Sequence, residues 1–245
     1  MKVSKTAVIL LFAIFCLLAS GCENTVTGTG PLGTQMPTES GKQDTTVTPG
    51  AIVEGNVSPE TIEQWAKSVV KLEAYNSKDE KINTGSGFAA FDNPVLITAR
   101  HVVVNMKYMI ATRDDGTTFK IERLIAEDET SDLAICYLPE DAGIPALLPS
   151  ESLPRRGEWV AAIGSQFGVR NLVTLGNVCG IWDPGDVERI LFTAPVSGGN
   201  SGGPLFNASG RFVGIVTGTY DKGQNMNVAA TYQSAVKLYK TLKLN

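Results

Sequence analysis

Histidine is almost absent from the sequence, and basic residues are not in excess. The 245 residues include one histidine, His101, and four cysteines. Because zinc centres combine several histidine and cysteine ligands, a site of that kind is excluded, and we expect no metal and no cofactor. Lysine and arginine total 21 against 25 acidic residues, a net charge of −4. Nucleic-acid-binding proteins neutralise phosphates with clustered basic side chains, so we expect no nucleic-acid partner.

Long hydrophobic runs are missing too, except near the N-terminus. Lys2 and Lys5 precede twelve apolar residues at 7–18, and small residues follow at 19–21. A basic start, a short apolar segment and a small-residue end are typical of a secretory signal peptide. Twelve helical residues rise about 18 Å, less than the roughly 30 Å core of a bilayer. A signal peptide at 1–21 is therefore favoured over a membrane-spanning anchor.

Cys22 directly follows the small residues. The segment Leu18-Ala19-Ser20-Gly21-Cys22 resembles a bacterial lipobox, although Ala19 stands where leucine is usual. The resemblance implies export to the cell envelope, in the periplasm or at the surface, and attachment to a bacterial membrane through lipid on Cys22. An ordinary cleaved signal is the alternative. Residues 22–57 are rich in threonine, glycine and proline, which predicts a flexible tether.

Residues 58–245 predict an all-β domain with a short helix at each end. Hydrophobic residues make up 43% of the chain, enough to bury a core. Ser58-Pro59-Glu60 is typical of a helix start, and helical spacing returns only at 232–244. Between them, runs of β-branched residues alternate with glycine and proline. We expect two sets of strands, at 69–75, 87–91, 95–98, 108–112, 119–126 and 133–138, and at 159–163, 173–181, 190–193, 204–206, 211–217 and 227–231. They predict two six-stranded antiparallel barrels, about 68–140 and 157–231.

The motif Gly199-Asn200-Ser201-Gly202-Gly203-Pro204 carries the most chemical information. A serine flanked by glycines can sit on a tight turn whose backbone amides converge and stabilise an oxyanion. The nucleophile turn of α/β hydrolases has a similar pattern, but there the histidine follows the serine. Here His101 precedes Ser201. A phosphate-binding loop would continue as Gly-Lys-Ser/Thr, which is absent.

His101 and Asp132 are the candidate partners of Ser201. His101 follows an apolar strand and is the only side chain that titrates near neutrality without perturbation, so it is the candidate general base. Asp132 directly precedes another strand. Taken singly, each residue has an ordinary structural role, such as an aspartate that satisfies a turn. Their order of histidine, aspartate and serine, each at a strand edge, predicts a nucleophilic site.

Four motifs resemble the trypsin-like serine proteases, and within them the bacterial HtrA/Deg branch. The match covers about residues 60–235 and consists of Gly85-Ser86-Gly87-Phe88, Thr98-Ala99-Arg100-His101-Val102-Val103, Ser131-Asp132-Leu133-Ala134 and Gly199-Asn200-Ser201-Gly202-Gly203-Pro204-Leu205. The resemblance implies a chymotrypsin-like double barrel and peptide-bond hydrolysis through an acyl-enzyme. Ser201 would be the nucleophile, His101 the general base and Asp132 the residue that orients the imidazole. The backbone amides of Gly199 and Ser201 would form the oxyanion hole.

The resemblance also assigns the residues that bind polypeptide substrates. Thr217, Gly218 and Thr219 correspond to the strand that pairs with the substrate backbone. Pro195 corresponds to the base of the specificity pocket, and because it is uncharged it implies cleavage after small or aliphatic residues. Asn200 replaces the aspartate of digestive relatives, so activation by N-terminal cleavage is not expected. The chain ends soon after this unit, and we expect no C-terminal PDZ domain.

Two other hypotheses remain open at this stage. One is a catalytically inactive protease fold that binds peptides at the cell envelope, and the other is a structural lipoprotein without a site, which predicts that Ser201 and His101 lie far apart. Cys136 and Cys179 lie in apolar strands of different units, so we expect buried free thiols rather than the disulfide that an exported protein could form. The sequence assigns no role to Arg100 and no oligomeric state.

Overall fold

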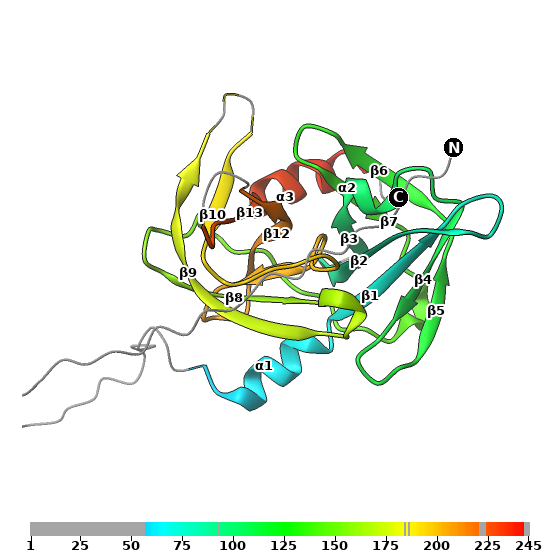
Figure 1. The fold of residues 1–245 in the computed structure, drawn as a ribbon, viewed down its shortest axis with the longest axis horizontal. Helices are drawn as coiled ribbons and strands as arrows, with labels where there is room; N and C mark the ends of the chain where they lie inside the picture. The colour runs from blue at the N-terminus through cyan, green and yellow to red at the C-terminus, as the bar shows by residue number, and fades with distance from the viewer. Residues whose placement is uncertain (1–56, 93, 184, 186, 221–223, 243–245) are drawn as a thin grey trace, which may run out of the picture. The chain divides into compact units, whose positions relative to one another are not determined.

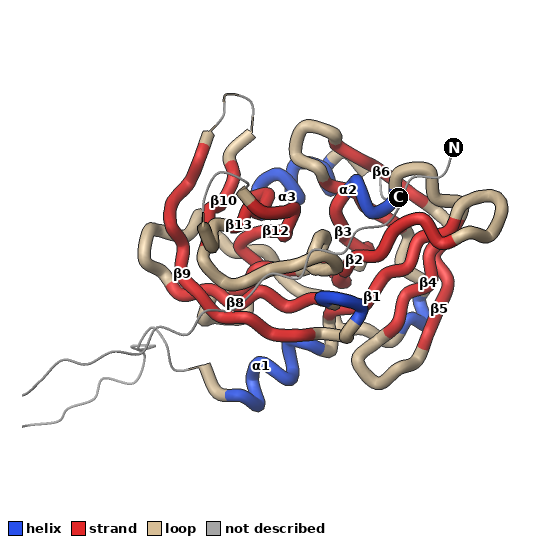
Figure 2. Tube along the Cα trace, viewed as in Figure 1, coloured by secondary structure: helices blue, strands red, loops and turns tan. Residues whose placement is uncertain are grey.

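The computed structural model describes residues 57–92, 94–183, 185, 187–220 and 224–242. The predicted signal peptide, Cys22 and all but the last residue of the predicted tether lie outside these residues. Strands make up most of the regular structure (Figure 2). In chain order the elements are α1 (Pro59–Ala66), β1 (Val69–Tyr75), β2 (Lys81–Ala90), β3 (Val95–Ala99), α2 (Arg100–Val103), β4 (Tyr108–Thr112), β5 (Thr118–Ile121), β6 (Leu124–Asp128), β7 (Leu133–Cys136), η1 (Glu140–Ala142), β8 (Trp159–Gly164), η2 (Gln166–Gly168), β9 (Leu172–Trp182), β10 (Arg189–Phe192), β11 (Pro204–Phe206), β12 (Phe212–Thr219), β13 (Asn227–Thr231) and α3 (Tyr232–Lys240).

The first sheet has seven antiparallel strands in the order β5-β4-β1-β2-β3-β7-β6 (Figure 1). The prediction of a closed six-stranded barrel in this half is therefore wrong. The strand expected at 119–126 bends at the exposed pair Glu122 and Arg123 into β5 and β6. These two strands occupy opposite edges of the sheet although only two residues separate them. The sheet must therefore curl until its edges come together, which makes it a half-barrel.

The second sheet is a closed six-stranded barrel in the order β10-β13-β12-β11-β8-β9, as predicted. All six strands lie where the sequence indicated, because β-branched runs and their glycine or proline boundaries are clearest in this half. In the first sheet β2 begins at Lys81 rather than at residue 87. The polar first half of β2 was not predicted, because apolar and polar residues alternate only weakly there. It nevertheless pairs with β1 as far as Tyr75↔Lys81.

One buried cluster of side chains joins the two sheets. Phe88 of β2 and Phe212 of β12 are fully buried, and their ring centroids lie 5.1 Å apart. The terminal helices close the two ends of this cluster: Trp65 of α1 stacks on Phe206 at 5.0 Å, and Tyr239 of α3 stacks on Phe91 at 4.0 Å. The two halves therefore share a core, which determines how their connecting loops meet.

The helices agree with the sequence in type but not in every boundary. Ser58 caps α1 by accepting a hydrogen bond from the backbone N–H of Thr61 at 3.3 Å, as the start signal predicts. The C-terminal helix ends at Lys240 rather than at residue 244. The single turn α2 was not predicted, because four residues show no periodicity. No helix among the described residues is long and apolar enough to span a bilayer.

Cys136 and Cys179 are both free, as predicted, but only Cys136 is fully buried. Burial in β7 raises the pKa of the Cys136 thiol to about 12. Burial also raises the pKa of Cys179, which is partly exposed on β9.

We expect the two thiols to differ in reactivity towards an alkylating reagent. Because the thiolate is the reactive form, labelling of Cys179 should increase between pH 7 and 9, whereas Cys136 should stay protected until the protein unfolds. Peptide mapping by mass spectrometry after alkylation of the native and the urea-unfolded chain measures both sites. Equal labelling of the two thiols in the native protein would contradict the buried position of Cys136.

Candidate active site

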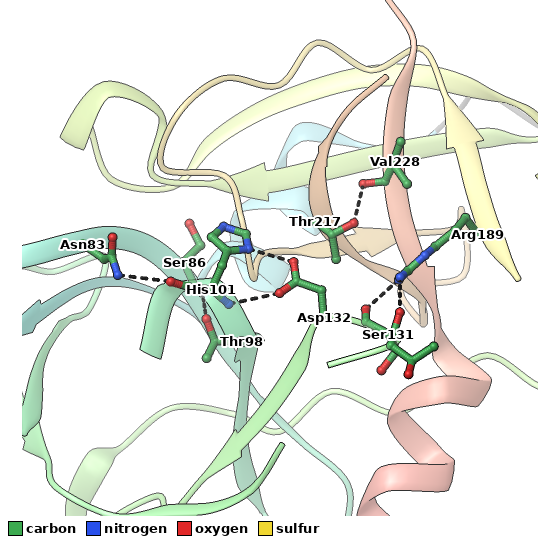
Figure 3. A network of polar contacts seen from close by, with 10 residues as sticks. Asn83, Ser86, Thr98, His101, Ser131, Asp132, Arg189, Thr217 and Val228 are labelled. Atoms are coloured by element: carbon green, nitrogen blue, oxygen red, sulfur yellow. Dashed lines mark hydrogen bonds and ion pairs between the residues drawn. The ribbon is translucent and has the colours of Figure 1, made fainter. Parts of the chain in front are cut away.

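The structure brings His101 and Asp132 into direct contact. The ring atom Nδ1 of His101 lies 2.7 Å from Oδ2 of Asp132, and the backbone N–H of His101 donates to Oδ1 at 3.0 Å (Figure 3). Both carboxylate oxygens therefore hold the histidine. With its Nδ1–H directed at the carboxylate, the neutral ring carries its lone pair on Nε2, which can accept a proton.

The backbone around both residues explains this arrangement. His101 lies in α2, the turn that begins directly after β3, and Asp132 lies in the turn before β7, which pairs with β3. Asp132 has a φ of +56°, in the left-handed region that aspartate tolerates better than most residues. Its carbonyl accepts a hydrogen bond from the N–H of Arg100 at 3.0 Å. The two turns are thus linked through both backbone and side chain.

Ser201 lies in the glycine-rich turn between β10 and β11. Gly199 and Gly202 have φ values of +103° and +88°, and a Cβ on either would come within 2.2 Å of a backbone oxygen. Both positions therefore require glycine. Within the part of the chain that the structure describes, the backbone amides of Gly199 and Ser201 donate no hydrogen bond.

Buried Ser86 of β2 connects this turn to the first sheet. Its backbone N–H donates to the carbonyl oxygen of Ser201 at 2.8 Å. Its hydroxyl donates to the carbonyl oxygen of Gly199 at 2.6 Å and accepts from the N–H of Ser165 at 2.8 Å. The resemblance drew attention to the Gly-Ser-Gly motif, but only the structure shows what the serine hydroxyl contacts.

The neighbouring Gly85 shows that the serine turn and α2 approach the same point. A Cβ on Gly85 would meet Cγ2 of Val102 at 2.6 Å and the carbonyl oxygen of Ser201 at 2.9 Å. Val102 follows His101 in the chain. The absence of a side chain at Gly85 thus allows the backbone of Ser201 to pack against the segment that carries His101.

Two of the four predicted substrate-binding residues line one cavity. Pro195 and Thr219 border a space of about 280 Å³, together with Val196, Tyr220, Asn225, Met226 and Asn227. No charged side chain lines it among the residues that the structure describes. Thr217 instead donates its hydroxyl to the carbonyl oxygen of Val228 at 3.3 Å (Figure 3), and Gly218 does not border the cavity.

Arg100 has charged partners that sequence reasoning did not find. Its guanidinium lies 3.4 Å from Glu127 and 3.6 Å from Glu129. These carboxylates belong to β6 and to the turn that leads to Asp132. No pattern in the sequence pairs them, because the contact depends on the order β3-β7-β6 in the folded sheet.

Comparison with known proteins gives one consistent family. Residues 85–215 match the trypsin-like peptidase domain. Over 177 residues the chain is 34% identical to serine protease HTRA1 of Xenopus laevis. The matched region covers 66% of this chain and 38% of that protein. Over 147 residues it is 35% identical to the probable periplasmic serine endoprotease DegP-like of Halomonas elongata, covering 58% and 31%. The chain therefore spans less than half the length of either relative.

A solved structure supports the same fold. The serine endoprotease from Yersinia pestis superposes with a TM-score of 0.64 at 25% sequence identity, covering 76% of this chain and 67% of that chain. The range that matches the peptidase domain contains His101, Asp132 and Ser201.

Replacement of Ser86 by alanine should destabilise the protein. The change removes the donor to Gly199 and the acceptor for Ser165, and a buried group left without its partner costs about 1–3 kcal/mol. Urea denaturation should show that the free energy of unfolding falls by that amount for each of the two groups. Ser150→Ala is the matched control, since the buried Ser150 hydroxyl both donates and accepts within its own loop, with Ser152. A Ser86→Ala protein as stable as the natural chain would show that the Ser86 hydroxyl is not structurally important.

Proposed function

The chain belongs to the trypsin-like peptidase family, and we propose that it is a serine endopeptidase that hydrolyses peptide bonds through an acyl-enzyme. The observation that carries the proposal is the 2.7 Å contact between His101 and Asp132, in a chain whose only histidine is His101. The glycine turn of Ser201 adds two backbone amides without acceptors among the described residues. A nucleophile, a base with its orienting group and an anion site are the components that acyl transfer requires.

The proposed reaction assigns one role to each group. The hydroxyl of Ser201 attacks the scissile carbonyl while Nε2 of His101 takes its proton, and Asp132 stabilises the imidazolium that forms. The backbone amides of Gly199 and Ser201 donate hydrogen bonds to the oxyanion, and the loss of one such donor costs about 2.7–4 kcal/mol of transition-state stabilisation. His101 then protonates the leaving amine. In the second half of the reaction His101 takes a proton from water, which attacks the acyl carbonyl, and returns that proton to the Ser201 oxygen as the acyl group leaves.

Substrate recognition would use the outer end of β12 and the cavity bordered by Pro195 and Thr219. An extended substrate segment can pair with the backbone at Thr217, Gly218 and Thr219 as an added strand. The side chain before the scissile bond would enter the cavity lined by Pro195 and Thr219. No carboxylate lines this cavity among the described residues, so none of them would compensate a basic side chain for its desolvation, which favours small or aliphatic residues.

We further propose that the peptidase acts in the bacterial cell envelope. Residues 1–21 would be the signal peptide, Cys22 the lipidated residue, 22–57 the tether and 58–245 the protease domain. The word periplasmic in the name of the Halomonas elongata relative agrees with export. The substrates would then be exported or envelope polypeptides.

A fluorophosphonate probe tests the proposed nucleophile. The folded chain should be labelled at Ser201, and Ser201→Ala should abolish labelling and lower kcat by roughly 10⁶-fold. Ser209→Ala, at an exposed serine in the loop after β11, is the control and should be labelled like the natural protein. A folded natural chain that stays unlabelled would favour the inactive, peptide-binding alternative.

Cleavage of an unbiased peptide library tests the proposed specificity. Small or aliphatic residues should precede the cleaved bond, with kcat/KM at least about tenfold above that for lysine or arginine, which corresponds to about 1.4 kcal/mol. Pro195→Asp should narrow or reverse this difference by placing a carboxylate in the cavity. Preference of the natural chain for basic residues would refute the assignment of the cavity.

A further inference from the structure

Arg189 of β10 reaches from the closed barrel to the turn that carries Asp132. One terminal nitrogen, Nη1, donates to the carbonyl oxygen of Ser131 at 2.6 Å, and Nη2 donates to the carbonyl oxygen of Thr130 (Figure 3). These two carbonyls immediately precede Asp132 in the chain. The planar guanidinium therefore holds two successive peptide groups at once, which a single-point donor cannot do.

The turn that Arg189 contacts carries a strained residue. Asp132 has its backbone in the left-handed region, a conformation that persists in a non-glycine residue where its surroundings enforce it. Local bonds contribute: the N–H of Asp132 donates to the carbonyl oxygen of Glu129 at 3.2 Å, and the Ser131 hydroxyl donates to Asp128 at 2.6 Å. Arg189 adds a contact from the closed barrel, so the turn is held from outside its own sheet as well.

The charge of Arg189 acts in the same direction as its geometry. The side chain is half-buried, and burial lowers its pKa, while the charges of Asp132 and Asp128 oppose that decrease. An arginine nevertheless stays protonated at neutral pH. The positive charge of Arg189 is thus attracted by the carboxylates of Asp132 and Asp128, which strengthens the contact between the guanidinium and the turn.

We propose that Arg189 is a positioning residue for the His101–Asp132 pair. The base and its carboxylate belong to the first sheet, whereas Ser201 belongs to the closed barrel, so their alignment depends on how the two sheets are held together. Ser86 links them from the first sheet to the serine turn, and Arg189 links them from the closed barrel to the aspartate turn. The catalytic consequence rests on the proposed function, but the structural consequence for His101 does not.

The experiment compares Arg189→Met with a matched control, Arg113→Met. Arg113 also donates from its guanidinium to two successive carbonyls, of Ala142 at 3.4 Å and Gly143 at 3.3 Å, which are not part of the aspartate turn. Because His101 is the only histidine, the proton on its Nδ1 gives a single assignable signal in a histidine-labelled sample. That signal, kcat and KM are measured for the natural chain and both variants.

In the natural chain the Nδ1 proton should resonate at low field, because the Asp132 carboxylate accepts it. In Arg189→Met its signal should move away from this position or broaden by exchange with water, because the carboxylate is no longer held in place. The value of kcat should fall roughly 10- to 100-fold, as expected for a displaced catalytic group. KM should stay within about twofold, since the loss affects the transition state more than substrate binding. Arg113→Met should match the natural chain in all three measurements.

An Arg189→Met protein whose Nδ1 signal and kcat equal those of the control overturns the proposal, even if its melting temperature is lower. Should Arg189→Met not fold, Arg189→Gln, which retains a single donor group, decides by the same measurements. If the natural chain shows no peptidase activity, the proposed function fails, and the Nδ1 signal alone decides the role of Arg189.

Discussion

The proposed chemistry of the site depends on the orientation of one side chain, the imidazole of His101. A neutral histidine can hold its proton on either nitrogen, and the 2.7 Å contact with Asp132 selects Nδ1 for the proton and leaves Nε2 as the base. Asp132 performs this role because its second oxygen accepts the backbone N–H of His101. The carboxylate thus aligns both the ring and the short helix that carries it.

The division of the chain into two sheets makes this orientation depend on tertiary contacts. His101 lies in the curled half-barrel and the turn of Ser201 in the closed barrel. One polar side chain from each half forms hydrogen bonds with the backbone of the other half. Ser86 binds the backbone around Ser201, and Arg189 binds the backbone before Asp132. Phe88 and Phe212 pack between the sheets and provide the apolar part of the same interface. Polar and apolar contacts together hold residues that are one hundred positions apart in the sequence.

Features that depend on a few neighbouring residues could be predicted from the sequence, whereas features that depend on distant residues could not. The strands of the closed barrel and the cap of α1 were predicted correctly, because alternation, turn residues and a capping hydroxyl act over a few neighbouring residues. The bend at Glu122 and Arg123 was missed, since a strand that turns a corner keeps its β-branched composition while changing its partner strand. The first half of β2 was missed because its residues are polar and alternate only weakly, although they pair with β1.

For the site, the sequence by itself determined which groups could act: one histidine, one glycine-flanked serine and an aspartate before a strand, in an order that excludes the α/β hydrolases. Residue types and their order are properties of the chain alone. Only the tertiary structure decided that the histidine contacts that aspartate, that Ser86 and Arg189 bridge the two sheets, and that the cavity at Pro195 is neutral among its described residues. These contacts depend on how two curved sheets pack, which is a sum of many long-range interactions that no short stretch of sequence encodes.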